Sequence, residues 1–216
     1  MATEECAAAG PERETWWARC FARLYDPSLW LGERAGMTQQ RRALLRETRG
    51  RVLEIGAGTG LNVPHYPSGL SELILTEPDA AMCRRLARRV EGRATVVTAA
   101  ADDLPVDDGS LDTVVATFVL CTVESPEVAL REIRRVLRPD GQLLLIEHVR
   151  SDGRRLASLQ RLLRKPWSRF ARGCRCDQPT AELLRDAGFR TELRPARWHA
   201  MPPIVRPLVV GRAFTG

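Results

Sequence analysis

The 216-residue sequence has no apolar run of about 18 residues, the length that a helix needs to cross a bilayer. Its first residues, Met1 to Cys6, also lack the basic start and apolar stretch of a secretory signal. We therefore expect a cytoplasmic protein without a transmembrane segment. In that compartment the six cysteines are expected to be reduced thiols.

Lysine is nearly absent, because Lys165 is the only one and arginine supplies almost all of the positive charge behind the net +6. The arginines are scattered along helical stretches with glutamates among them, which is typical of solvated helix faces. We expect no nucleic-acid partner and at most a weak association with anionic membrane surfaces. Cys174 and Cys176 are clustered but have no second pair nearby, so no metal site is expected.

The most informative stretch runs from Arg51 to Gly60. A short apolar run typical of a buried strand ends abruptly at Gly56, Gly58 and Gly60. Glycine permits positive φ angles and leaves the backbone open to a ligand. The carboxyl ends of strands in open α/β sheets are where nucleotide-like ligands bind, although a structural glycine turn is the alternative.

Two carboxylates bracket this glycine loop. Glu54 lies just before it, and Glu77 ends the next apolar run roughly 20 residues later, where an acid meets ribose hydroxyls in such folds. A dinucleotide fingerprint needs glycine where this sequence has Leu61. Glu54 would also repel a pyrophosphate but would tolerate a cationic ligand. S-adenosylmethionine therefore fits better than NAD.

The rest of the chain predicts one α/β domain with a helical lid. Residues 1–50 contain no strand pattern but two helical stretches, one broken at Asp26-Pro27 and one from Thr38 to about Glu47 that Thr38 is expected to cap. They are expected to form a lid over the sheet, with core packing as the alternative. Residues 51–216 alternate strands and helices, which predicts a seven-stranded, doubly wound, mostly parallel Rossmann-like sheet. Its last two strands are expected to pair as a hairpin-like edge.

Residues expected to contact the cofactor lie at strand ends and in the loops that follow them. Asn62 is close enough to reach the methionine part, and Leu104 after two acids suits a loop lying on an adenine ring. The complete set is Glu54, Gly56, Ala57, Gly58, Gly60, Asn62, Glu77, Pro78, Asp102, Asp103, Leu104 and Thr117. Tyr25 in the lid and Trp167 in the basic helical insertion after the fifth strand are candidate substrate contacts, with core packing as the alternative for Trp167.

Several motifs resemble a known family. Val52 to Gly60 resembles the first motif of class I S-adenosylmethionine-dependent methyltransferases. Asp108–Asp112, Arg134–Pro139 and Glu147–Val149 resemble motifs of the ubiquinone/menaquinone-type family. Leu120-Cys121 and Gly173-Cys174 resemble the methyltransferase-like protein seven group, thiol S-methyltransferases of the microsomal membrane. The resemblance implies a small-molecule methyl acceptor, although the membrane anchor of that group is not expected here and Arg175 replaces a small or imidazole side chain.

The acceptor atom stays open at this point. A thiol with a pKa near 8.5 is partly ionised already, whereas an oxygen acceptor needs a more definite base. His148, at the end of a central strand, is the candidate base, with a structural role as the alternative. Cys121 is expected near the reaction, as pocket wall rather than nucleophile. The other hypotheses are an O-, N- or C-methyltransferase for a quinone, phenol, natural product or lipid headgroup, and a binding module without catalysis.

Overall fold

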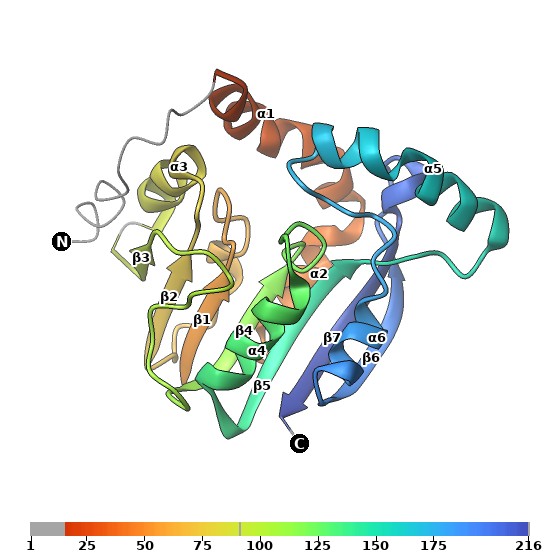
Figure 1. The fold of residues 1–216 in the computed structure, drawn as a ribbon. Coiled ribbons are helices and arrows are strands. Elements are labelled where there is room, and N and C mark those ends of the chain that lie inside the picture. Colours follow the sequence, from red (N-terminus) through yellow and green to blue (C-terminus); the bar gives the residue numbers. More distant parts are fainter. Residues whose placement is uncertain (1–15, 91, 216) are drawn as a thin grey trace.

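The computed structural model describes residues 16–90 and 92–215, in which helices flank a seven-stranded sheet (Figure 1). The α-helices are α1 (Trp16–Gly32), α2 (Thr38–Leu45), α3 (Ala80–Val90), α4 (Pro126–Val136), α5 (Arg154–Phe170) and α6 (Thr180–Asp186). The strands are β1 (Arg51–Ile55), β2 (Glu72–Thr76), β3 (Thr95–Val97), β4 (Leu111–Thr117), β5 (Leu137–His148), β6 (Phe189–Arg197) and β7 (Pro207–Thr215). A π-helical turn (Glu33–Met37) joins α1 to α2, and short 3-10 helices span Val63–His65 and Pro203–Val205.

The strand order is β3-β2-β1-β4-β5-β7-β6, which confirms the predicted doubly wound sheet. The first five strands are parallel, and β7 is antiparallel to both β5 and β6. Strands β2 and β3 extend the sheet on one side of β1, whereas β4 and β5 extend it on the other. The strand order therefore reverses between β1 and β4, and ligands of open α/β sheets bind beyond the strand ends at such a point. The predicted hairpin-like pair is present, with β6 as the outermost strand.

Strand β1 is buried on both faces, as its continuous apolar pattern predicts. Leu53 and Ile55 pack into the core beneath α4, where they join Ile133. Val52 faces the opposite side and packs with Leu45 of α2. Each Å² of buried apolar surface stabilises the fold by roughly 25 cal/mol, so burial on both faces stabilises the position of β1. The loop that follows β1 is therefore presented from a fixed support.

Two expectations for the N-terminal helices are wrong. Asp26-Pro27 does not break the first helix, because α1 continues through Pro27 to Gly32. Pro27 has no backbone N–H, so the Arg23 carbonyl lacks its partner within the helix. Arg23 and Pro27 are both exposed, so water can bind that carbonyl instead. The second helix starts at Thr38 as expected but ends at Leu45, and the Thr38 hydroxyl donates to Glu33 (3.1 Å) rather than capping the helix.

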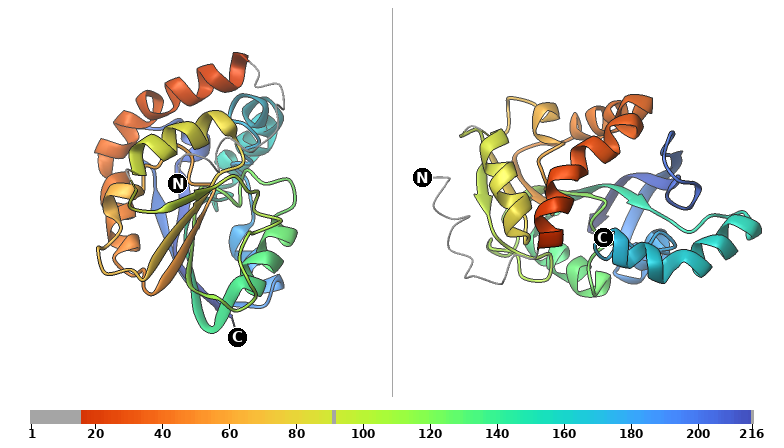
Figure 2. Two further views of the ribbon diagram at one scale, coloured as in Figure 1. Left: turned by 90° about the vertical axis from the view of Figure 1, so that its left-hand side faces the viewer. Right: turned by 90° about the horizontal axis from the view of Figure 1, so that it is seen from above.

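Helices α1 and α5 lie across the carboxyl ends of the parallel strands, as Figures 1 and 2 show. This position agrees with the expected lid, whereas α2 packs into the core below. The division into a lid of residues 1–50 and a cofactor domain of residues 51–216 stays a prediction. Among the described residues, the helices are too short or too polar to cross a membrane.

The cysteines only partly follow the expectation of reduced thiols. Cys20, Cys121, Cys174 and Cys176 are free. Cys83 is disulfide-bonded, so the expectation is wrong at this position. Sequence spacing does not reveal which cysteines meet when the fold brings distant segments together. Cys6 lies outside the described residues.

Candidate active site

The loop after β1 turns sharply because its glycines have positive φ angles: 57° at Gly56, 60° at Gly58 and 85° at Gly60. A Cβ atom would lie 2.9 Å from the Val119 side chain at Gly56 and 2.9 Å from the Leu86 side chain at Gly60. These two positions therefore need glycine for packing as well as for conformation. A Cβ atom at Gly58 would meet no heavy atom within 4 Å. Gly58 borders open space, where a ligand can approach the backbone.

Glu77 follows β2 and turns its carboxylate toward this loop. Its Oε2 accepts a hydrogen bond from the Gly58 N–H at 2.8 Å, and its Oε1 accepts one from the Asp79 N–H at 2.9 Å. Glu77 is only 7% exposed, and this burial raises the pKa of its carboxyl to about 7. The loop thus fixes a hydrogen-bond acceptor beside the open space at Gly58.

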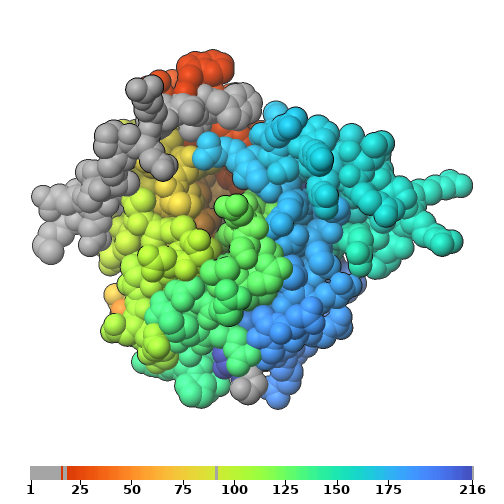
Figure 3. Space-filling model, viewed as in Figure 1, coloured from red at the N-terminus to blue at the C-terminus, as the bar shows by residue number. Residues whose placement is uncertain are grey.

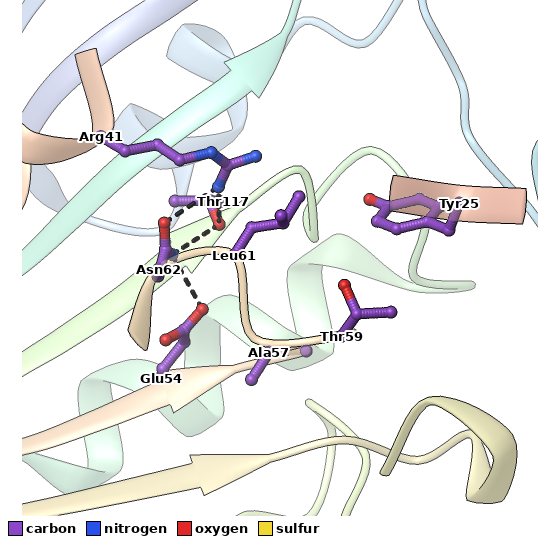
Figure 4. Close-up of a pocket in the computed structure, with 10 residues that line it drawn as sticks. Tyr25, Arg41, Glu54, Ala57, Thr59, Leu61, Asn62 and Thr117 are labelled. Carbon is purple, nitrogen blue, oxygen red and sulfur yellow. Dashed lines mark hydrogen bonds between the residues drawn. The ribbon is translucent and has the colours of Figure 1, made fainter. Parts of the chain in front are cut away.

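A small pocket lies at the carboxyl ends of β1 and β4 (Figure 4). Glu54 accepts hydrogen bonds from the Asn62 side-chain amide at 2.8 Å and from the Tyr66 hydroxyl at 2.7 Å. The Asn62 amide also donates to the Thr117 hydroxyl at 3.0 Å. Burial raises the pKa of Glu54 to about 7, and the two hydrogen bonds act in the opposite direction. Three of the predicted cofactor residues, Glu54, Asn62 and Thr117, therefore form one network.

Arg41 completes this network, and no sequence signal distinguishes it from the neighbouring Arg42. It is only 3% exposed, and its Nη1 donates to the Asn62 side-chain oxygen at 2.9 Å and to the Thr117 hydroxyl at 3.3 Å. Its Nε donates to Glu33 at 3.1 Å, which pairs the buried charge. Neighbouring Arg42 is exposed. A buried cation from the N-terminal helices thus stands at the wall of the small pocket (Figure 4).

A second, much larger cavity of about 1300 Å³ opens beyond the strand ends. Figure 3 shows the hollow between the segments around residues 80, 120 and 170. Most of its wall is apolar, with Leu29, Phe118, Trp198 and Met201 among the lining residues. The predicted site residues on this wall are Tyr25, Gly56, Gly58, Glu77, Pro78, Asp102, Cys121, His148 and Trp167.

Other predicted residues reach only the small pocket or neither space. Ala57 lines the small pocket. Gly60 packs against α3, and Leu104 is buried in the core with its N–H donated to Glu132 at 3.1 Å. Asp103 and Leu104 are absent from the lining of either space, whereas Asp102 is present. Of the three residues predicted for the adenine loop, Asp102 lines the cavity, and Asp103 and Leu104 do not.

The site matches known proteins in sequence. Residues 53–145 match a family model described as a methyltransferase domain. The human thiol S-methyltransferase TMT1B is 35% identical over 172 residues, which cover 76% of this chain and 68% of that protein. The chain belongs to the class I S-adenosylmethionine-dependent methyltransferases. Its cofactor is S-adenosylmethionine, as the glycine loop and the two carboxylates predicted.

Further methyltransferases agree with this assignment. The ubiquinone/menaquinone biosynthesis C-methyltransferase UbiE of Pseudomonas paraeruginosa is 36% identical over 107 residues, which cover 45% of this chain and 41% of that protein. The crystal structure of a methyltransferase from Thermotoga maritima, described as a possible histamine N-methyltransferase, superimposes with a TM-score of 0.69 at 25% identity. That match covers 93% of this chain and all of the other.

The residues around Gly58 fit the cofactor of this methyltransferase family. Gly58 borders open space on the cavity wall, and Glu77 offers carboxylate oxygens to a pair of ribose hydroxyls. Asp102 on the cavity wall is available to an exocyclic amine. Arg41 supplies the positive charge that suits the carboxylate of the methionine part. Polar groups of suitable sign thus surround the two connected regions of the methyltransferase site.

His148 lies in an aromatic cluster on the cavity wall. Its ring centroid is 4.8 Å from that of Phe118 and 5.7 Å from that of Trp198. Burial lowers the pKa of His148 to about 4, against a smaller effect of hydrogen bonding to the Val205 backbone. Its Nδ1 is buried and has no hydrogen-bond partner among the described residues. The ring is neutral at pH 7 and keeps a free acceptor nitrogen.

The helix α1 is tied directly to the glycine loop of the methyltransferase. The Thr59 hydroxyl donates to the Asp26 carboxylate at 2.5 Å, and Arg89 of α3 donates to the same carboxylate at 2.7 Å. Tyr25, the neighbouring residue, lines both the small pocket and the large cavity. Asp26 therefore holds Tyr25 over the site, and the contact of Tyr25 with substrate stays a prediction.

Proposed function

We propose that this methyltransferase acts on the sulfur of a lipophilic small-molecule thiol. The observation that carries the proposal is the 35% identity to a human thiol S-methyltransferase over 76% of this chain, together with the largely apolar cavity beyond the strand ends. The lowered pKa of His148, the candidate base on the cavity wall, agrees with it. A base with a pKa of about 4 removes a proton poorly from a phenol of pKa near 10. A thiol of pKa near 8.5 supplies a few per cent of reactive thiolate at neutral pH without help.

The chain's own residues then have mainly positioning roles. The bound cofactor supplies an activated methyl group whose transfer leaves its sulfur uncharged. Glu77 and Gly58 hold the ribose end, and Arg41 holds the methionine carboxylate. The aromatic wall of Phe118 and Trp198 excludes water from the acceptor, and the His148 ring lies against the same wall. Alignment of this kind supplies a large share of the rate of a displacement reaction.

A panel of acceptors tests this proposal. Purified protein is assayed with S-adenosylmethionine and a simple alkyl thiol, a hydrophobic aryl thiol, a phenol, a hydroquinone and an amine. We expect methylation of the thiols, with the hydrophobic thiol preferred because the cavity wall is largely apolar. Methylation of the phenol or hydroquinone alone would reject the thiol acceptor. Titration calorimetry with the cofactor alone separates loss of binding from loss of chemistry.

A second candidate is methylation of a quinone-type oxygen or carbon. The cavity volume of about 1300 Å³ exceeds the roughly 300 to 1,000 Å³ of an ordinary ligand pocket, which suits a bulky lipophilic acceptor as well as the cofactor. The similarity to UbiE supports the same acceptor class. The hydroquinone of the panel decides this candidate.

We also propose a weak association with anionic membrane surfaces, from which a lipophilic acceptor can enter. Leu24, Leu31 and Phe170 are more than half exposed and line the cavity. Helix α5 adds exposed Leu162 and a row of arginines. Elsewhere arginines pair with acids, as Arg135 does with Glu132 at 2.8 Å. The absence of a nucleic-acid partner stays a prediction. A cytoplasmic location stays a prediction.

A further inference from the structure

Two thiols meet on the cavity wall although they are distant in sequence. Cys121 follows β4, Cys174 follows α5, and both line the large cavity. Their sulfur atoms are 3.9 Å apart. Methyl transfer from a sulfonium needs no nucleophile of the enzyme, so the proposed function uses neither thiol chemically. A pair of neighbouring thiols in the acceptor cavity has a chemistry of its own.

The contact between the two segments is built into the backbone. The Arg175 N–H donates to the Cys121 carbonyl at 2.6 Å, and the Arg175 guanidinium donates to the Val123 carbonyl at 2.7 Å. A Cβ atom at Gly173 would lie 2.7 Å from the Thr122 carbonyl oxygen, and Gly173 has a φ angle of 96°. Only glycine fits there. The loop after α5 is therefore held against residues 121–123 in a way that keeps the thiols together.

The two thiols are not equivalent. Cys174 is 6% exposed and Cys121 is fully buried, so a ligand in the cavity reaches Cys174 first. The hydrogen bond between the thiols lowers the pKa of Cys174 and raises the pKa of Cys121 well above its usual value. The thiolate is the reactive form of cysteine, so Cys174 is the attacking sulfur of the pair. Trp167 lies beside it and also lowers the pKa of Cys174.

The carboxylate of Glu147 lies next to the Cys121 thiol. Glu147 is fully buried and accepts hydrogen bonds from the N–H groups of Val119 (2.8 Å), Leu120 (2.9 Å) and Cys121 (3.2 Å). Burial raises the pKa of Glu147 to about 7, so it can take up and return a proton near neutral pH. The Cys121 thiol thus has a proton acceptor at hand.

We propose that Cys121 and Cys174 form a redox-active dithiol that reduces small disulfides in the acceptor cavity and so releases the thiol acceptor there. This inference rests on the proposed thiol acceptor and extends it from thiols to their disulfides. The ligand class is a low-molecular-weight disulfide of the same lipophilic thiols.

The reaction proceeds by two exchanges that balance. The Cys174 thiolate attacks one sulfur of the disulfide, the sulfur–sulfur bond breaks, and one thiolate leaves while a mixed disulfide forms at Cys174. Cys121 then attacks the Cys174 sulfur, its proton passes to Glu147, and the second thiolate leaves and is protonated. The small disulfide gains two electrons and the protein dithiol loses two. A dithiol reductant restores the pair for a further turnover.

The geometry permits this closure. A disulfide bond is about 2.05 Å long, so the two sulfur atoms must approach by roughly 2 Å, which side-chain rotation and a small shift of the loop after α5 supply.

The test is a single turnover without cofactor. The full chain is reduced, freed of reductant and incubated with diphenyl disulfide, and the released thiophenol is measured together with the intact protein mass. The Cys121→Ser/Cys174→Ser double variant, treated in the same way, reports the exchange of all other cysteines. Relative to it, we expect two further thiols released per protein, loss of two further hydrogen atoms, and a peptide cross-link between Cys121 and Cys174. Peptide mapping of the unmodified sequence needs no variant, so it remains informative if a variant fails to fold.

Variants assign the two roles. Cys121→Ser should stop at the mixed disulfide on Cys174 and release one thiol, and Cys174→Ser should release none from this pair. Cys20→Ser and Cys176→Ser are the matched controls and should behave like the unmodified protein. Recovery of both Cys121 and Cys174 as free thiols, or a cross-link to other cysteines, would overturn the inference.

A separate assay distinguishes this inference from the proposed function. Methylation of the reduced alkyl thiol is measured with S-adenosylmethionine under excess reductant. Disulfide exchange without thiol methylation would remove the thiol acceptor and leave an exchange activity unconnected to methyl transfer, which overturns the inference as stated. Thiol methylation without exchange would overturn the dithiol alone and leave the proposed function standing.

Discussion

At the scale of single residues, Glu77 carries the clearest prediction. Replacing Glu77 with Ala removes a charged acceptor for the ribose hydroxyls, an interaction worth about 1.5 to 3 kcal/mol. We expect the dissociation constant for S-adenosylmethionine to rise at least about tenfold in titration calorimetry. Glu72→Ala is the matched control, because Glu72 lies at the opposite end of β2 and pairs with Arg51. Equal affinities for Glu77→Ala and the unmodified protein would show that the ribose lies elsewhere.

Arg41 offers a comparison with its neighbour. Arg41→Ala removes the buried cation of the small pocket and leaves Glu33 without its partner, whereas Arg42 is exposed. We expect Arg41→Ala to weaken cofactor binding by about tenfold or more and to lower the melting temperature, because breaking a buried ion pair costs several kcal/mol. Arg42→Ala should change neither quantity. Arg41→Lys should restore only part of the affinity, since lysine cannot reproduce the guanidinium fork.

His148 is tested by the pH dependence of the reaction. His148→Phe keeps the aromatic packing with Phe118 and Trp198 but removes the acceptor nitrogen. With a thiol acceptor we expect kcat/KM to change by less than about threefold at both pH 7 and pH 9, because the thiol ionises without a base. A loss of about tenfold near pH 7 that disappears near pH 9 would show instead that His148 acts as the base.

Residue identity predicted part of this site and missed the rest for a physical reason. Glu54, Gly58 and Glu77 could be predicted as candidates, because a strand followed by glycines indicates where ligands of such folds bind. Arg41 was missed because two adjacent arginines look alike in sequence, and only the orientation of α2 decides which one is buried. Leu104 was expected on the cofactor, but its side chain fills the core, since an apolar residue in a loop satisfies either environment.

At the scale of elements, α5 makes a prediction about surfaces. Leu162 is 75% exposed on a helix that carries Arg161 and Arg164, so an apolar and a cationic group face solvent together. We expect the protein to cosediment with vesicles rich in anionic lipid at low salt, and Leu162→Glu to reduce the bound fraction several-fold. Arg131→Gln on α4 is the control, because it also lowers the net charge by one at an exposed position. Binding that is unaffected by Leu162→Glu would exclude α5 as the contact.

Local sequence signals predict most of the helices and strands but not all of their ends or their positions in the sheet. The helix–strand alternation from β1 to β5 follows from apolar periodicity and from turn residues such as Gly141. Pro27 misled the prediction for α1, because a proline costs little where the helix face is exposed and water can satisfy the freed carbonyl. The position of β7 between β5 and β6 depends on long-range pairing, which sequence periodicity does not encode.

At the scale of the whole molecule, three buried carboxyls set the pH dependence of stability. Burial raises the pKa values of Glu54, Glu77 and Glu147 to about 7, from about 4.5 when unfolded. Between pH 4.5 and pH 7 these carboxyls are protonated in the folded protein but ionised in the unfolded chain. Their contribution to the unfolding free energy is therefore complete below about pH 4.5 and is lost as the pH rises through 7. His148 acts oppositely: with a folded pKa of about 4, its contribution is lost as the pH falls below 6.5.

The window from pH 8 to 6.5 isolates the carboxyls, because His148 is neutral in both the folded and the unfolded state over most of it. Each carboxyl changes the unfolding free energy by at most about 1.4 kcal/mol per pH unit. We expect the cofactor-free protein to melt several degrees higher at pH 6.5 than at pH 8, since about 1 kcal/mol shifts a domain of this size by roughly 2 to 4 °C. Glu147→Gln should reduce this difference in a calorimetric scan, and exposed Glu127→Gln on α4 should not. A melting temperature that instead rises from pH 6.5 to pH 8 would mean that these carboxyls ionise normally in the folded protein, and would remove Glu147 as a proton acceptor near neutral pH.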